Sequence, residues 1–204
     1  MRKLILASTS RYRAQALERL GLSFNTHAPD VDEEALTAQM PLDQAGPESL
    51  SALALRLAHA KAASVAAQYR DVVVIGADQV GELNGTRVGK PHTKTAAIKQ
   101  LCELSGHHAQ FHSAVVVHDT RAGTRHGRVV TTELEFRAFS AEAAQYYVDL
   151  DNPIDCAGSF KVEAAGIALF RRVVSDDPSA LVGLPMIALL DQLEQCGINP
   201  LQPA

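Results

Sequence analysis

The chain has 204 residues, of which 47% are hydrophobic and 21% are charged, and its formal net charge is −4. The acidic balance argues against a dedicated binder of duplex nucleic acid, which presents a basic face. No apolar run approaches the roughly 18 residues of a membrane span. The three cysteines are widely spaced and form no C-x-x-C pair, which argues against a disulfide framework or a zinc site. We therefore expect a cytoplasmic protein without a membrane partner, folded as one domain over residues 1–204.

Strands and helices alternate along the chain, which predicts an α/β fold with a mixed sheet flanked by helices. Runs of β-branched and apolar residues indicate the strands, and the 3.6-residue period with capping residues indicates the helices. Residues 40–47 are expected to form a surface connection. The expected strands are 3–7, 24–27, 72–75 with extended chain to 83, 109–119, 127–137 and 167–173, and the expected helices are 11–20, 49–69, 93–104, 140–149 and 185–196.

Polar residues fill the junction between the first strand and the first helix, where the chain reads Ser8-Thr9-Ser10-Arg11-Tyr12-Arg13. Hydroxyl groups there can cap the helix, and the free N–H groups of its first turn form an anion site. Two arginines in the first turn oppose the helix dipole, so local helix stability does not explain them. Two interpretations stay open, a phosphate-binding loop and a serine cap beside solvated arginines.

The segment from Val72 to Pro91 has the strongest local pattern. Four β-branched residues open it and predict a strand that is buried on both faces. Asp78 follows, at the expected carboxyl end of this strand, where open α/β sheets place their ligands. Asn84-Gly85 predicts a type I′ hairpin turn, which would bring Lys90 back toward Asp78. An acid and a base at the two ends of one hairpin indicate a site.

Carboxylates also cluster after the second expected strand, at Asp30, Asp32, Glu33 and Glu34. Taken alone, such a cluster is more typical of a solvated acidic loop. Together with Asp78 it is also the second source of oxygen ligands for Mg²⁺ or Mn²⁺. Lys61 lies on the longest expected helix, where a lone lysine is ordinarily a surface residue.

Familiar nucleotide-binding and hydrolase motifs are absent or incomplete. The segment 85–91 departs from a P-loop in its glycine spacing and has proline where Ser or Thr is required. No G-x-G-x-x-G or G-x-S-x-G occurs. Cations that hold phosphate oxygens and carboxylates that hold a metal are typical of phosphoryl or nucleotidyl transfer to water. The chain carries such a set, with cations at Arg11, Arg13, Lys61, Lys90 and Lys161 and carboxylates at Glu33 and Asp78.

Segments spread over the chain resemble the Maf family of nucleotide pyrophosphatases: LILASTSRYR, PDVDEE, RLAHAKA, GADQV, GKP, CAGSFKVEAAGIALF and LVGLP. They occur in the family's order and cover essentially the whole chain. Gln79 after the aspartate, and Lys161-Val162-Glu163, resemble the branch that hydrolyses 7-methyl-GTP. The branch that acts on dTTP and UTP has threonine after the aspartate. The resemblance implies a two-lobed mixed sheet flanked by helices with the active cleft between the lobes, as in Maf and ITPase-like proteins, and commonly a homodimer.

The resemblance also implies roles for individual residues. Asp78 would be the catalytic acid–base residue. Tyr12, Gln79 and Glu163 would be specificity positions, with Tyr12 standing where this branch often has tryptophan. The remaining roles are phosphate binding by Ser8, Arg13, Lys61, Lys90 and Lys161, and the binding of a divalent cation (Mg²⁺, Mn²⁺ or Co²⁺) by Glu33 and Asp78.

The implied reaction is attack of water on the α–β phosphate linkage of 7-methyl-GTP, which gives 7-methyl-GMP and pyrophosphate. An aspartate pKa near 3.9 lies roughly 12 units below that of water, on the order of 16 kcal/mol for full proton transfer. We therefore infer that metal activation of the water and Asp78 act together. Two alternatives stay open: a pyrophosphatase for a broader set of noncanonical triphosphates, dTTP and UTP, and a nucleotide-binding regulator of cell division and septum formation.

Base recognition can be interpreted from the same residues. A carboxylate at Glu163 can accept hydrogen bonds from N1–H and the N2 amine of guanine, and the Gln79 amide is expected to hold O6. Methylation at N7 makes the base cationic, which favours stacking on the Tyr12 ring. Without the resemblance, the more ordinary interpretation is that Tyr12 packs in the core and Glu163 is a solvated charge.

Overall fold

The computed structural model describes residues 2–38 and 47–202, so the expected surface connection at 40–47 lies, apart from Pro47, outside the described residues. The described residues form a seven-stranded sheet of order β2-β1-β3-β5-β6-β7, with β4 paired to β3. β1 runs parallel to β2 and β3, and the other neighbours are antiparallel, which confirms the mixed sheet. The strands are β1 (Lys3–Ala7), β2 (Phe24–Thr26), β3 (Val72–Leu83), β4 (Thr86–Val88), β5 (His108–Asp119), β6 (Thr124–Phe136) and β7 (Phe170–Val174).

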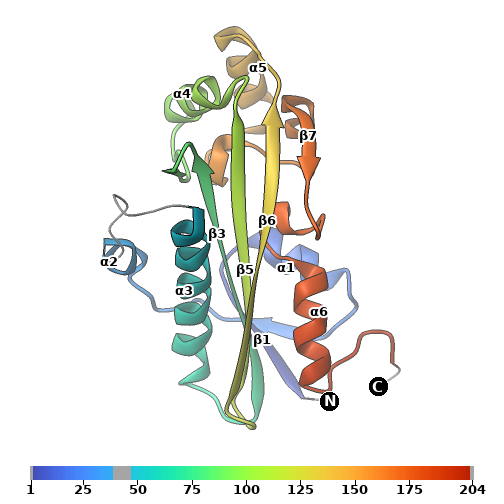
Figure 1. The fold of residues 1–204 in the computed structure, drawn as a ribbon. Helices are drawn as coiled ribbons and strands as arrows, with labels where there is room; N and C mark the ends of the chain where they lie inside the picture. The colour runs from blue at the N-terminus through green and yellow to red at the C-terminus, as the bar shows by residue number, and fades with distance from the viewer. Residues whose placement is uncertain (1, 39–46, 203–204) are drawn as a thin grey trace.

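Helices flank this sheet, as expected (Figure 1). α3 covers one face of the sheet around the first half of β3, α1 and α6 cover the other face there, and α4 and α5 gather at the opposite end of the sheet. No helix within the described ranges is long and apolar enough to cross a membrane. The helices are α1 (Arg11–Glu18), α2 (Glu33–Ala38), α3 (Pro47–Ala66), α4 (Lys94–Leu104), α5 (Ala141–Asp151) and α6 (Met186–Gln195), with short 3-10 helices η2 (Ala157–Ser159), η3 (Ala165–Leu169) and η4 (Ala180–Val182).

Some expected element boundaries are wrong. β3 does not pause after Ile75, because β5 pairs with it continuously from Val73 to Glu82. Asp78 therefore lies inside a strand and not at its carboxyl end. The last strand begins at Phe170, since the preceding residues form η3. Of the acidic cluster expected as an exposed loop, Asp30 and Asp32 do lie in a loop, whereas Glu33 and Glu34 form the first turn of α2, where acidic residues suit the helix dipole.

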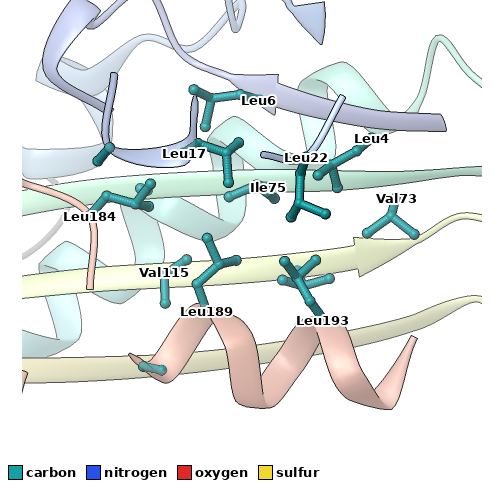
Figure 2. Packing of buried hydrophobic residues seen from close by; sticks show 14 of the residues in the cluster. Leu4, Leu6, Leu17, Leu22, Val73, Ile75, Val115, Leu184, Leu189 and Leu193 are labelled. Carbon is teal, nitrogen blue, oxygen red and sulfur yellow. The ribbon is translucent and has the colours of Figure 1, made fainter. Parts of the chain in front are cut away.

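The two faces of β3 pack against different helices, because successive side chains of a strand point to opposite faces. Val73 and Ile75 join a buried cluster with residues of α1, α6 and β5 (Figure 2). Val72 and Val74 pack against α3 on the other face. The expectation of a strand buried on both faces is therefore confirmed. The labelled members of the cluster in Figure 2 are Leu4, Leu6, Leu17, Leu22, Val73, Ile75, Val115, Leu184, Leu189 and Leu193.

One edge of β3 has a gap in its strand pairing. β1 pairs with the first part of β3, up to Gly76, and β4 pairs with its last part, from Gly81. Residues 77–80 have no strand partner on this edge, whereas β5 pairs with them along the other. Beyond the gap, α4 and α5 cover a separate apolar cluster. The gap thus separates two groups of elements, a first group that packs around the start of β3 (α1, α3 and α6) and a second group beyond the gap (α4 and α5).

Candidate active site

A cleft of about 540 Å³ opens beside this gap, within the range of roughly 300–1,000 Å³ that small-molecule sites occupy. The first group of elements contributes residues of α1, α2 and α3. The second contributes the return strand of the hairpin and the segment that follows α5. Of the residues predicted for the site, those that line the cleft are Tyr12, Arg13, Glu33, Lys61, Asp78, Gln79, Lys90 and Glu163.

Lys61 connects the two carboxylates predicted to act together. α3 lies so close to β3 that a Cβ atom on Gly76 would meet the Ala58 carbonyl oxygen at 2.3 Å. This close packing brings Lys61 Nζ to 2.5 Å from Asp78 Oδ1 and 2.8 Å from Glu33 Oε1. Lys61 and Asp78 are each only 6% exposed, so Lys61 is not the surface residue that its helical position alone predicts.

Glu33 is the more accessible of the two carboxylates. Its partial burial opposes ionisation, but the hydrogen bond and charge of Lys61, with the charges of Lys90 and Arg13, hold the pKa of Glu33 below its ordinary value. Glu33 is therefore ionised at neutral pH. Asp32 serves the structure instead, because its Oδ1 accepts a hydrogen bond from the Ala35 N–H at 2.9 Å.

The loop before α1 combines both interpretations that the sequence left open. Ser10 caps the helix by accepting a hydrogen bond from the Arg13 N–H. Arg13 nevertheless faces the cleft, and its Nε donates to the Gly183 carbonyl at 2.9 Å. Burial lowers the pKa of Arg13, against the raising effect of Asp78 and Glu33. Arg13 thus takes part in the helix cap through its backbone and faces the cleft with its side chain.

Arg11 takes a different position from Arg13. Its side chain is exposed, its Nη2 donates to the Tyr12 hydroxyl at 2.9 Å, and its guanidinium carbon lies 4.9 Å from the centre of the Tyr12 ring. Tyr12 lines the cleft and is half-buried, so it is not part of the apolar core. The core interpretation of Tyr12 is therefore wrong.

Gln79 also lines the cleft, although it follows Asp78 in β3 and its side chain therefore leaves the strand on the other face. Its Nε2 donates to Ser113 Oγ at 2.9 Å and lies 3.1 Å from the Ala180 carbonyl and 3.3 Å from that of Leu181. The amide nitrogen expected to hold guanine O6 is therefore already engaged by the protein. Glu163 lines the same cleft from the segment after α5, and it is exposed.

Two predicted residues do not line the cleft. Ser8 is buried, and its Oγ accepts a hydrogen bond from the Ser10 N–H at 3.1 Å. Lys161 turns its Nζ to the Asp151 carbonyl, and its backbone N–H donates to the Tyr147 hydroxyl. The described structure thus gives both residues contacts that support neighbouring segments.

The cleft also contains residues that sequence reasoning missed. Arg87 lies on β4 opposite Glu82, and its Nη1 donates to Thr37 Oγ1 of α2 at 3.2 Å. Strand alternation offered a signal, because Arg87 must point away from the side on which its buried neighbour Val88 packs. Other lining residues without a sequence signal are Thr37, His92 and Asp155.

The carboxylate pair can be tested for its fit to a divalent cation. No group of three or more His, Cys, Asp or Glu side chains among residues 2–38 and 47–202 is arranged to hold a metal ion. Asp78 and Glu33 nevertheless converge on one point, where the Lys61 ammonium lies. Mg²⁺ is usually held by one or two carboxylates, with waters and substrate phosphates as its other ligands. Two carboxylates are thus enough for a cation of this kind, and in this structure the Lys61 ammonium contacts both of them.

Several known proteins are similar to this chain over nearly its whole length. The 7-methyl-GTP pyrophosphatase of Aromatoleum aromaticum is 47% identical over 196 residues, which is 96% of each chain. That of Xanthomonas axonopodis pv. citri is 46% identical over 199 residues, which cover 98% of this chain and 99% of the relative. The solved Ham1 protein of Staphylococcus aureus aligns over 66% of this chain and 71% of its own with 16% identity and a TM-score of 0.41, too low to support a conclusion. A family model described as Maf-like protein matches residues 3–196, and the chain therefore belongs to the Maf-like protein family.

Proposed function

We propose that this protein is a nucleoside triphosphate pyrophosphatase that hydrolyses 7-methyl-GTP to 7-methyl-GMP and pyrophosphate, the activity named for its relatives. The observation that carries the proposal is the content of one cleft. A pair of carboxylates lies beside three cations, and next to them stand an aromatic ring and the amide and carboxylate side chains of Gln79 and Glu163. The first set suits a triphosphate and its cation, and the second set suits a base.

The triphosphate end is formed by Arg13, Lys61 and Lys90, which all line the cleft. Each ammonium or guanidinium group forms charge-assisted hydrogen bonds with phosphate oxygens. Ser8 supports this end by accepting the Ser10 N–H, which holds the loop before α1. For Lys161, phosphate binding stays a prediction, since its Nζ contacts the Asp151 carbonyl.

The chemical step uses Asp78. Its Oδ1 accepts a hydrogen bond from Lys61, and we assign its other carboxylate oxygen to accept the proton of the attacking water. Asp78 and Glu33 would hold a divalent cation (Mg²⁺, Mn²⁺ or Co²⁺), which supplies charge stabilisation for phosphoryl oxygens and lowers the pKa of a bound water. Lys61 then holds Asp78 in place and adds positive charge beside the linkage that breaks.

The base end is formed by Tyr12 and Glu163. A cationic 7-methylguanine stacks on the Tyr12 ring more strongly than neutral guanine does, by about 0.5–2 kcal/mol. The Glu163 carboxylate accepts hydrogen bonds from the donors of the guanine edge. We therefore expect Tyr12→Ala to narrow the preference for 7-methyl-GTP over GTP. Glu163→Ala should lower kcat/KM for both guanine nucleotides and leave that for UTP unchanged. An unchanged ratio of 7-methyl-GTP to UTP hydrolysis would contradict this assignment.

A nucleotide panel tests the proposed reaction directly. Purified protein is mixed with 7-methyl-GTP, GTP, dTTP or UTP and with Mg²⁺, Mn²⁺ or Co²⁺, and pyrophosphate release is measured. We expect 7-methyl-GTP to have the highest kcat/KM, with turnover of at least about 1 s⁻¹, and chelation of the cation to stop it. Equal kcat/KM values for all four nucleotides would favour a broader pyrophosphatase. Binding without pyrophosphate release would refute the enzymatic function.

We further propose that residues 1–204 fold as one domain, act in the cytoplasm and form a homodimer. The long strands β3 and β5 contribute to the apolar clusters on both sides of the gap, which supports one cooperative domain. A single calorimetric unfolding transition is the expected result, and two separate transitions would contradict it. Light scattering on the purified protein tests the dimer.

A further inference from the structure

The orientation of the Gln79 side chain is determined by its neighbours. Nitrogen and oxygen of an amide are hard to distinguish by shape, so their assignment depends on hydrogen-bond partners. The carbonyl groups of Ala180 and Leu181 can only accept hydrogen bonds, and both face one end of the Gln79 amide. That end must be the NH₂ group. The Gln79 carbonyl oxygen is then the group left for the cleft, which Gln79 lines.

Ser113 completes this arrangement. It is fully buried, lies directly opposite Gln79 in the register of β3 and β5, and accepts a hydrogen bond from Gln79 Nε2 at 2.9 Å. Its own hydroxyl proton is donated to the Ala180 carbonyl at 2.7 Å. Because that proton is already used, the Ser113 oxygen can only accept from Gln79. Ser113 therefore favours the same amide orientation as the two carbonyls.

The segment that carries these carbonyls is itself held firmly. The buried Asp177 carboxylate accepts hydrogen bonds from the Ser179 and Ile187 N–H groups, which ties the start of η4 to the start of α6. At its other end, the Gly183 carbonyl accepts from Arg13 Nε. The acceptors around Gln79 are thus part of a hydrogen-bonded framework, and rotation of the amide by half a turn would place its oxygen against two carbonyl oxygens.

We infer that Ser113 is a positioning residue that fixes the Gln79 amide with its oxygen toward the cleft, so that the base is read by acceptors alone. This inference rests on the proposed function. Guanine offers three hydrogens, at N1 and at the N2 amine, of which N1–H and one amine hydrogen lie side by side on the Watson–Crick edge. The Glu163 carboxylate and the Gln79 oxygen match these donors. Uracil offers one N–H between two carbonyl oxygens, which would face acceptors unfavourably. Guanine O6 is not held by Gln79.

The test compares binding of product-like monophosphates, which does not require hydrolysis. Dissociation constants are measured by calorimetry for GMP, IMP, 1-methyl-GMP and 6-thio-GMP with the wild type and with Gln79→Met. IMP lacks the N2 amine, 1-methyl-GMP lacks the N1 hydrogen, and 6-thio-GMP changes only O6. We expect Gln79→Met to weaken GMP and 6-thio-GMP equally, by about tenfold. One of the other two, IMP or 1-methyl-GMP, lacks the hydrogen that Gln79 accepts. Gln79→Met should weaken the binding of that analogue much less, because the interaction is already absent from the wild-type complex.

If Gln79→Met weakens the binding of GMP, IMP and 1-methyl-GMP equally but that of 6-thio-GMP much less, then Gln79 donates to O6, and the inference is overturned. The effect of Gln79→Met could depend on the N1 or N2 hydrogen of the ligand in a protein that releases no pyrophosphate. That result would refute the proposed function and leave the inference standing. Turnover of 7-methyl-GTP with an equal effect of Gln79→Met on all four monophosphates would support the proposed function and refute the inference. The two proposals are therefore distinguished by one set of proteins.

Ser113 is tested by substitution with a matched control. Ser113→Ala should lower the preference for GTP over UTP about threefold to tenfold, mainly by raising KM for GTP, and Ser113→Thr, which keeps the hydroxyl, should retain the preference. The control is Thr120→Val, which removes a hydroxyl that bonds the Val72 backbone at the far end of the sheet. It should lower Tm without changing base preference. If Ser113→Ala also lowers Tm without changing base preference, Ser113 is merely structural.

Discussion

Replacement of Lys61 by methionine is a sensitive test of the charge centre in the cleft. The substitution keeps an unbranched side chain of similar length and removes the ammonium that lies 2.5 Å from Asp78 and 2.8 Å from Glu33. At an effective dielectric constant of about 20, each attraction amounts to roughly 6–7 kcal/mol before desolvation is subtracted. Removal of one partner of a buried pair leaves an uncompensated charge and typically costs about 3–5 kcal/mol. In a protein of this size, that corresponds to a fall in Tm of roughly 6–20 °C.

Thermal unfolding at pH 7, followed by circular dichroism, measures this effect. The control is Lys94→Met, because the Lys94–Asp149 pair has a similar N–O distance of 2.7 Å but both side chains are about half exposed. That variant should lose less than about 1 kcal/mol. Adding Asp78→Asn to Lys61→Met should recover part of the loss, since no unpaired buried charge remains. Equal Tm values for Lys61→Met and Lys94→Met would refute the reasoning.

The same variant tests the proposed cation site without an activity measurement. Lys61→Met frees Asp78 and Glu33 from the ammonium that contacts both. Mn²⁺ at millimolar concentration should then raise Tm more in Lys61→Met than in the wild type, because binding to the native state stabilises it. A Glu33→Gln substitution in the Lys61→Met protein should reduce this extra shift. No larger Mn²⁺ shift in Lys61→Met than in the wild type would contradict cation binding by the pair.

Three further predictions concern single side chains. Asp78→Asn should fold and bind nucleotide but lower kcat about 10²-fold or more, and near-normal turnover would contradict its role. Lys90→Ala should lower kcat/KM about tenfold or more for every triphosphate, whereas Lys161→Ala should have a smaller effect because its Nζ contacts a backbone carbonyl; equal losses would place Lys161 in the phosphate site. Hydrogen bonds from Arg2 hold the pKa of Asp119 far below its ordinary value despite burial. A lowered folded-state pKa stabilises the protein above the unfolded value of about 3.9 and loses this effect as pH falls. The unfolding free energy should therefore fall more steeply below about pH 5 in the wild type than in Asp119→Asn, and parallel curves would contradict the pairing.

Local features of the fold could be predicted from the sequence because they depend on neighbouring residues. Thr93 and Ser140 cap the helices expected after them, since a hydroxyl next to free N–H groups acts within one turn. Asn84 and Gly85 both adopt positive φ, as the hairpin turn requires. The alternation of Val72 to Ile75 places their side chains in two cores on opposite faces. Most of the residues to which the family resemblance assigned roles also line the cleft.

Contacts between distant segments decided the rest, and the sequence alone could not supply them. Lys61 is buried because α3 packs closely on Gly76, so the prediction of a surface lysine from its helical position was wrong. Arg13 is distinguished from Arg11 by the Gly183 carbonyl, 170 residues away. Gln79 is oriented by Ala180, 101 residues away, which reverses the hydrogen-bonding role expected for its amide. Periodicity and capping determine which elements form, because they act over one or two turns. The direction, burial and partners of a site residue follow only when strands pair and helices pack, because those groups are brought together by the tertiary structure.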